Sequence, residues 1–141
     1  MNKQLLLTAI WLASFVGTLA VIESYVQVED ATGKTVLIPE DRVDAMKPVV
    51  VVYGGYLTGI LAFWFLKPFR PLRNPRKWHQ YRFAVALACT LVFNAIILYL
   101  VSQHYLSGHT LVLDDVDTAS TFAGLLSFVV APVNAYYFGV Q

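Results

Sequence analysis

Four long apolar stretches dominate the pattern of hydrophobic and polar positions along this chain. They cover residues from about 4–22, 48–66, 83–103 and 119–140. A hydrocarbon core about 30 Å thick requires roughly 20 apolar residues at a helical rise of about 1.5 Å per residue, so each stretch is long enough to cross a bilayer. We therefore predict an all-α integral membrane protein, with four transmembrane helices in one domain over residues 1–141.

Composition supports the bilayer as the solvent. Hydrophobic residues make up 57% of the chain and charged residues 13%, and the mean hydropathy is +0.60, which is unusual for a soluble domain. The single cysteine, Cys89, lies in the third apolar stretch, so no disulfide can form within the chain. We interpret Cys89 as a small packing residue.

The charged residues fall into two groups of opposite character. Six basic residues and no acidic residue lie in 67–82, whereas all nine acidic residues fall in the other two polar loops, 23–47 and about 104–118. Because loops rich in Lys and Arg stay on the cytosolic side of a membrane, we predict that both termini and 67–82 face the cytosol. The predicted location is the bacterial cytoplasmic (inner) membrane.

The first outward loop has its own local pattern. Two short β-prone runs, VQV and TVLI, flank the turn-like sequence DATGK, which predicts a small β-hairpin on the membrane surface. Asp44 and Asp117 precede the second and fourth apolar stretches at a distance typical of an N-cap, so we expect them to cap those two helices.

Glu23 is the one acidic residue that comes close to a membrane interior. Ionisable groups deep in a bilayer are costly and are functional candidates by default, but no predicted span contains one away from its ends. Glu23 lies at the outer edge of the first span. It is either a solvated residue of the membrane surface or an outer gate that faces the bundle.

The sequence carries no recognisable catalytic or metal-binding pattern. His79, His104 and His109 all lie outside the interiors of the spans, which excludes a pair of haem ligands inside the bundle. A surface metal site made from His104, His109 and the nearby aspartates is less favoured than a solvated acidic loop. No nucleophile with its base, phosphate-binding glycine loop or zinc pattern is present. We expect no enzymatic activity, no cofactor and no nucleic-acid partner.

Four polar residues within the spans are candidates for helix contacts or for a polar path through the membrane: Thr58, Asn94, Ser127 and Asn134. Asn94 follows Arg82 by twelve residues, which places it about 18 Å along a helix from the cytosolic boundary. An amide at that depth must face protein or water, because an unsatisfied donor in hydrocarbon costs several kcal/mol. Carbonyl groups released by Pro132 are possible partners for Asn134.

The second span adds features that concern helix packing. Gly55 and Gly59 form a G-x-x-x-G pattern, in which small residues allow two helices to approach closely, either within one protomer or between protomers. Tyr53 and Tyr56, together with Thr90 of the third span, extend the set of polar groups expected at membrane depth.

The basic loop has two interpretations. In the first it sets the topology and is attracted to anionic lipids of the cytosolic leaflet. In the second it binds a lipid phosphate or an acidic partner, because Arg can bind phosphate through two hydrogen bonds at once. The residues assigned to this second role are Arg70, Arg73, Arg76, Lys77 and Arg82.

The second half of the chain resembles the GtrA-like family of small four-span membrane proteins. The similarity is carried by Arg82-Phe83, Asn94 in the third span, and the ending FVVAPVNAYYF, which contains Asn134. The first half lacks the corresponding features. The resemblance implies a role in polysaccharide assembly, with movement of polyprenyl-phosphate-linked sugars and contact between the basic loop and lipid phosphate.

We therefore expect a small non-catalytic membrane protein, either a carrier or an accessory subunit, that handles a polyprenyl-phosphate-linked or other anionic lipid. Four short helices enclose little volume, so a path would form between protomers, which favours a homo-oligomer. Two alternatives are an interaction subunit of a larger membrane complex, such as an immunity-type protein, and an oligomeric channel lined by Thr58, Asn94 and Ser127.

Overall fold

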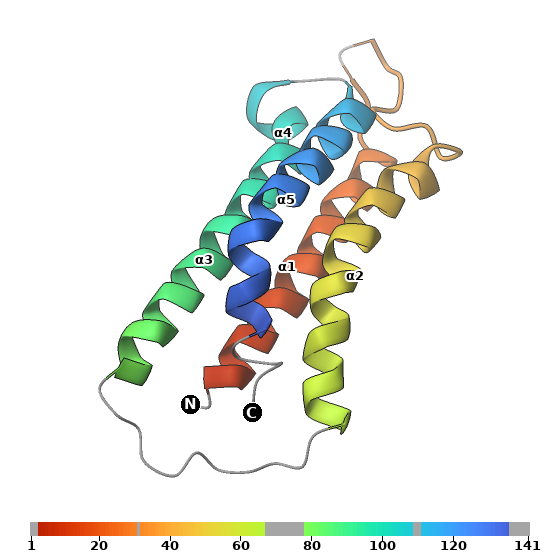
Figure 1. Ribbon diagram of the computed structural model, residues 1–141. Helices are drawn as coiled ribbons and strands as arrows, with labels where there is room; N and C mark the ends of the chain where they lie inside the picture. The colour runs from red at the N-terminus through yellow and green to blue at the C-terminus, as the bar shows by residue number, and fades with distance from the viewer. Residues whose placement is uncertain (1–2, 31, 67–77, 109–110, 136–141) are drawn as a thin grey trace.

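The computed structural model describes residues 3–30, 32–66, 78–108 and 111–135, and these residues are almost entirely helical (Figure 1). The helices are α1 (Lys3–Tyr25), α2 (Arg42–Leu66), α3 (Trp78–Val101), α4 (Gln103–Ser107) and α5 (Val112–Asn134). No strand occurs in this part of the chain. The fold is thus all-α, as the four apolar stretches predict.

Four of the helices, α1, α2, α3 and α5, are long and apolar enough to cross a membrane. The 23 residues of α1 span about 35 Å at the helical rise, which exceeds the thickness of a hydrocarbon core. Large apolar side chains cover the outside of the bundle, including Val16, Val51 and Phe128, which are 61%, 75% and 82% exposed. Soluble monomers rarely present so much apolar surface. These features indicate an integral membrane protein.

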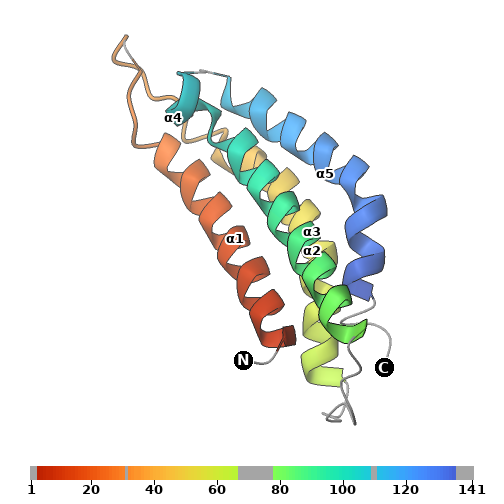
Figure 2. The same cartoon turned by 90° about the vertical axis from the view of Figure 1, so that its left-hand side faces the viewer.

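The four long helices form a bundle in which consecutive helices are not always neighbours. Helices α1 and α3 run in one direction, and α2 and α5 run in the other (Figures 1 and 2). Helix α1 packs against α2 and α3, and α5 packs against the same two helices. It follows that α1 lies diagonally opposite α5, and α2 diagonally opposite α3. We call the end of the bundle that holds α4 the α4 end, and the opposite one, where α1 begins, the Lys3 end.

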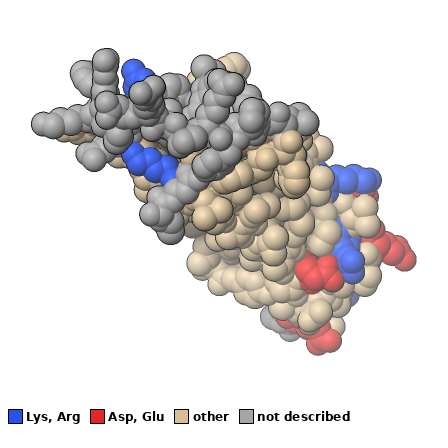
Figure 3. Space-filling view, turned by 90° about the horizontal axis from the view of Figure 1, so that it is seen from below, with Lys and Arg blue, Asp and Glu red and all other residues tan. Residues whose placement is uncertain are grey.

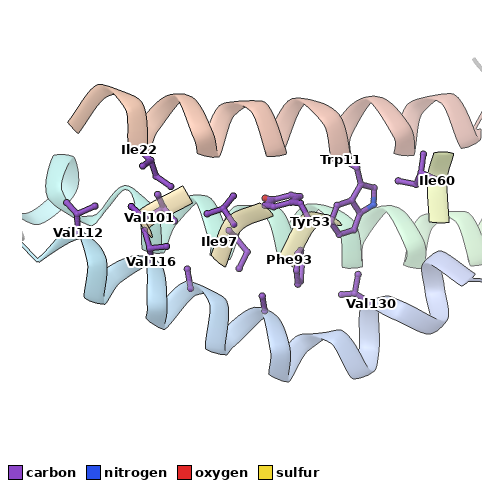
Figure 4. Close-up of a cluster of buried hydrophobic side chains, with 14 of the residues drawn as sticks. Trp11, Ile22, Tyr53, Ile60, Phe93, Ile97, Val101, Val112, Val116 and Val130 are labelled. Carbon is purple, nitrogen blue, oxygen red and sulfur yellow. The ribbon is translucent and has the colours of Figure 1, made fainter. Parts of the chain in front are cut away.

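Side chains from all four long helices fill the centre of the bundle (Figure 4). The largest fully buried ones are Trp11, Tyr25, Tyr53 and Phe93. Toward the α4 end the core becomes aliphatic. Figure 4 shows Ile22, Ile97, Val101, Val112 and Val116 gathered there, on the far side of Tyr53 from Trp11. The core therefore has an aromatic middle and an aliphatic layer next to α4.

The acidic residues extend the helices beyond the apolar stretches. Helix α5 begins at Val112 and holds Asp114 and Asp115 in its first turn, where the partial positive charge of a helix N-terminus favours carboxylates. Asp117 lies inside α5, and Asp44 lies in the first turn of α2. Both N-cap predictions were therefore wrong, because each aspartate lies inside its helix and not before the first helical residue.

The connection from α1 to α2 contains a tight turn. Glu29 and Thr35 form one antiparallel bridge, and the amide of Gly33 donates a 3.0 Å hydrogen bond to the carbonyl of Asp30. Gly33 has a φ of 77°, a conformation that glycine adopts without strain. The predicted β-hairpin itself stays a prediction, because residue 31 in its turn lies outside the described residues.

Candidate functional site

One of the residues predicted to bind phosphate, Arg82, belongs to the described part of the chain. The others lie outside it, namely Arg70, Arg73, Arg76 and Lys77. Arg82 lies in α3 near the Lys3 end and is exposed. At the same end, the ammonium group of Lys3 sits 5.0 Å from the centre of the Phe83 ring, a cation–π contact between α1 and α3. The described part of the Lys3 end is thus basic and carries an exposed arginine.

Glu23 lies at the α4 end and forms an ion pair between helices. A carboxylate oxygen of Glu23 lies 3.1 Å from Nη1 of Arg42, which joins the last turns of α1 to the start of α2. The Glu23 and Arg42 side chains are 40% and 47% exposed. A half-exposed pair of this kind fits a solvated membrane-surface residue better than a gate inside the bundle.

Thr58 and Ser127 lie toward the outside of the bundle. The Thr58 hydroxyl donates to the carbonyl of Gly54 at 2.7 Å, and the Ser127 hydroxyl donates to the carbonyl of Gly124 at 2.6 Å. Each hydroxyl is therefore satisfied by its own helix. Within one chain neither shares the interior with Asn94, so a path lined by all three would require several copies.

The glycines of the G-x-x-x-G pattern are also on the outside. Gly55 and Gly59 are exposed, and a Cβ atom added to either would meet no atom of this chain within 4 Å. Close helix packing within the protomer therefore does not explain these glycines.

Asn94 lies in the interior of the bundle, as predicted from the cost of exposing an amide to lipid. Its side chain is 4% exposed, and its Nδ2 donates to the backbone carbonyl of Thr90 at 2.8 Å. Among the described residues, the other polar atom of the amide, Oδ1, has no hydrogen-bond partner, and neither has the buried hydroxyl of Thr90. One turn of α3 thus presents two unpartnered oxygen atoms to the core.

Asn134 is buried at the end of α5. Its side chain is 8% exposed, and its Nδ2 has no hydrogen-bond partner among the described residues. Pro132 lies inside the same helix, two residues earlier. The predicted bond from this amide nitrogen to carbonyls released by the proline is therefore absent.

Trp11 is the interior residue that the sequence reasoning missed. Its ring stacks on Tyr56 with centroids 4.6 Å apart and an interplanar angle of 24°, and it lies 5.4 Å from Phe93. The indole Nε1 is buried and has no hydrogen-bond partner in the part of the chain that the structure describes. The Trp64 indole differs, because it donates to the Thr8 hydroxyl at 3.0 Å. A signal was present, because tryptophan favours membrane interfaces and Trp11 lies in the middle of a span.

A second aromatic group lies at the α4 end and connects α1 with α3 and α4. The Tyr25 hydroxyl donates to the carbonyl of Val101 at 2.8 Å, and the hydroxyls of Ser24 and Tyr105 are 2.7 Å apart. The Tyr25 ring also lies 5.0 Å from the Tyr105 ring and 5.5 Å from His104. These contacts fix the last turn of α1 against α3 and α4.

His104 and the acidic residues that are described do not gather into a metal site. No group of three or more His, Cys, Asp or Glu side chains among the described residues is placed to hold a metal ion. His109, the other histidine considered for a surface site, lies outside these residues.

No known protein family, no curated protein and no solved structure matches this chain.

Proposed function

We propose that this protein is a non-catalytic membrane protein of the bacterial cytoplasmic membrane, whose Lys3 end faces the cytosol and binds the phosphate of an anionic lipid. In this role it acts as a carrier or as an accessory subunit, and a polyprenyl-phosphate-linked sugar is the candidate substrate. The observation that carries the proposal is the separation of charge between the two ends of the bundle.

All nine acidic side chains belong to the α4 end, in the connection between α1 and α2 or in the adjoining turns of α1, α2 and α5. The described charged residues of the Lys3 end are the basic residues Lys3 and Arg82, and the sequence adds five more between α2 and α3. In Figure 3 an uncharged tan surface separates the charged side chains of the two ends. Basic loops are retained in the cytosol, which supports the proposed orientation.

The same charge distribution supports phosphate as the ligand. Lys and Arg near the cytosolic leaflet are attracted to anionic headgroups by about 1 kcal/mol each. Arginine also forms paired hydrogen bonds with phosphate oxygens, so Arg70, Arg73 and Arg76 suit a lipid phosphate better than a diffuse negative surface.

The packed interior supports binding at the surface of the bundle. Trp11, Tyr53 and Phe93 fill its middle and are at most 1% exposed. A lipid chain has no room between such residues within one protomer. We therefore place the lipid against the outside of the helices, with its phosphate at the Lys3 end, or between two copies of the chain.

A charge reversal tests the proposal. Arg73→Glu with Arg76→Glu should abolish the retention of an anionic lipid, while Lys34→Glu with Lys47→Glu, at the α4 end, should leave it intact. The two variants change the net charge equally. Native mass spectrometry from a mild detergent reports the bound lipid, and size-exclusion chromatography checks folding. Equal lipid retention in both variants would refute the phosphate site.

The orientation is tested separately. In a Cys89→Ala background, Asn74→Cys should be labelled by a membrane-impermeant maleimide only after the cells are opened, whereas Thr32→Cys should be labelled in intact cells. The reverse pattern would place the Lys3 end outside. Because this measurement does not depend on lipid binding, it separates a wrong orientation from a wrong ligand.

One observation favours interaction with another protein as a second function. The connection between α1 and α2 is anchored by Leu37, which is 3% exposed and donates its amide to the Tyr25 carbonyl at 3.1 Å, yet the next residue, Ile38, is 55% exposed. An anchored loop with an exposed apolar residue suits a docking surface. Ile38→Asp should then release a co-purifying partner, while Thr35→Asp should retain it; retention in both would reject this function.

A further inference from the structure

The middle of the bundle brings together polar atoms from three helices. Trp11 of α1 stacks on Tyr56 of α2, and both rings lie 5.4 Å from Phe93 of α3. Thr90 and Asn94 flank Phe93 in the sequence and share its buried face of α3. Figure 4 shows the Trp11 and Phe93 rings meeting in the centre of the core.

Four polar atoms of this group have no hydrogen-bond partner in the described part of the chain: Trp11 Nε1, the Tyr56 hydroxyl, Thr90 Oγ1 and Asn94 Oδ1. Trp11 and Thr90 are 0% exposed and Asn94 is 4% exposed, so solvent outside the bundle does not reach them. An unsatisfied polar group in a membrane interior costs several kcal/mol. Four such groups would outweigh a typical folding free energy of about 5–15 kcal/mol, and they therefore require a partner.

The four atoms define the chemistry of that partner. The Trp11 indole can only donate, the Asn94 oxygen can only accept, and the two hydroxyls can do both. Asn94 Nδ2 already donates one of its two N–H groups to the Thr90 carbonyl. The partner must therefore both donate and accept hydrogen bonds.

The partner must also be small and uncharged. The four apolar stretches contain no Asp, Glu, Lys or Arg away from their ends, so an ion at this depth would have no compensating charge. The aliphatic layer formed by Ile22, Ile97, Val101 and Val116 separates the group from the α4 end. Water fits these conditions, since a buried water typically makes about three hydrogen bonds to otherwise unsatisfied groups.

We propose that ordered water occupies the bundle between Trp11, Tyr56, Thr90 and Asn94, and that it bridges the indole donor of α1 to the amide oxygen of α3. This site is separate from the proposed phosphate site at the Lys3 end. It makes the middle of the membrane-spanning core a hydrated polar centre beneath a dry aliphatic layer.

The test is the transfer of NMR magnetisation from water to the indole Nε1–H of Trp11 in ¹⁵N-labelled protein in lipid nanodiscs. Trp11→Phe assigns the signal. We expect a water cross-peak with the sign of a bound water in the native chain and its loss in Asn94→Leu, which removes the acceptor. Thr58→Val, which alters an exposed hydroxyl bonded to its own helix, should leave the cross-peak unchanged.

Two results of the NMR measurement would overturn the proposal: absence of the cross-peak in the native chain, or its persistence in Asn94→Leu. If Asn94→Leu does not fold, Thr90→Val provides the second variant and should weaken the same cross-peak. The Trp64 indole, which donates to Thr8, is an internal reference whose signal should not respond to either change. A high-resolution structure without density between Asn94 and Trp11 would likewise reject the bound water.

Discussion

The helices are joined in different ways at the α4 end and in the middle of the bundle. At the α4 end, directional contacts cross between helices: Tyr25 donates to the Val101 carbonyl at 2.8 Å, and Glu23 pairs with Arg42 at 3.1 Å. In the middle, Trp11 packs on Tyr56 and Phe93 by ring contact, and none of the described residues accepts a hydrogen bond from its Nε1. The α4 end therefore fixes the register of the helices, while ring packing holds the middle together.

The largest expected effect is that of Trp11→Ala on the stability of the middle of the bundle. The variant removes the ring that joins α1 to α2 and α3, and by analogy with other buried aromatic residues it should lower the free energy of unfolding by about 3–5 kcal/mol. Leu12→Ala is the matched control, because Leu12 is the next residue and is 46% exposed on the bundle surface. Unfolding in mixed micelles with increasing SDS measures both. Equal losses would show that the ring contacts do not hold the middle together.

Tyr25→Phe probes the α4 end with a smaller change. The variant keeps the ring but removes the hydroxyl that donates to the Val101 carbonyl, and hydrogen bonds between membrane helices contribute about 1 kcal/mol. We expect a loss of that size in the same SDS titration. Tyr99→Phe, on the exposed face of α3, should change little. If Tyr25→Phe lowers the free energy of unfolding no more than Tyr99→Phe does, the hydrogen bond from Tyr25 to Val101 does not stabilise the α4 end.

The Glu23–Arg42 pair should contribute less still. Its side chains are about half exposed, and pairs of this kind are worth about 0.5 kcal/mol and are weakened by salt. A double-mutant cycle with Glu23→Gln and Arg42→Gln measures the coupling energy. We expect the coupling to fall as the salt concentration rises, and a coupling that is indifferent to salt would indicate a desolvated pair instead.

The smallest predicted effect is the loss of stability of the turn between α1 and α2 at low pH. The Thr32 hydroxyl, which donates to Asp30 Oδ1 at 2.6 Å, and the amides of Lys34 and Thr32 hold the pKa of Asp30 below its ordinary value of 3.8. A lowered folded pKa means that the turn is stabilised above the ordinary pKa, and that this stabilisation is lost as the pH falls through the folded pKa. NMR titration of the carboxyl carbon follows this change.

Thr32→Val should return the pKa of Asp30 toward its ordinary value, and Thr35→Val should not. An unchanged pKa in Thr32→Val would mean that the backbone amides alone hold the carboxylate. Because the turn lies beyond the ends of the long helices, neither variant should alter the SDS unfolding of the bundle.

The sequence predicted the four spans well because bilayer thickness imposes a length that apolar stretches must meet. It did not predict where the helices begin, since Asp114 and Asp115 suit a polar loop and the first turn of α5 equally well. It also did not predict which helices are neighbours. Helices that are apolar on every face carry no stripe that indicates which side is buried.

The candidate polar residues show a similar limit. Asn94 was expected to face protein or water, and it is buried, because its amide has too many polar atoms for its own helix to satisfy. Thr58 and Ser127 do not have to be buried, because each hydroxyl donates to a carbonyl of its own helix and can therefore face lipid. The apolar pattern does not single out Trp11, because tryptophan is grouped with the hydrophobic residues although its single N–H needs a partner.

The diagonal placement of α2 and α3 bears on how the chain is assembled as the ribosome delivers it. Helices α1, α2 and α3 are synthesised first, and α2 and α3 both pack along α1. Between α2 and α3 themselves the ring contact is the one from Tyr56 to Phe93. In the finished bundle α5 covers one side of α2 and one side of α3, and both of these sides stay open until α5 has been made. The last helix packs against both α2 and α3 and therefore closes the bundle.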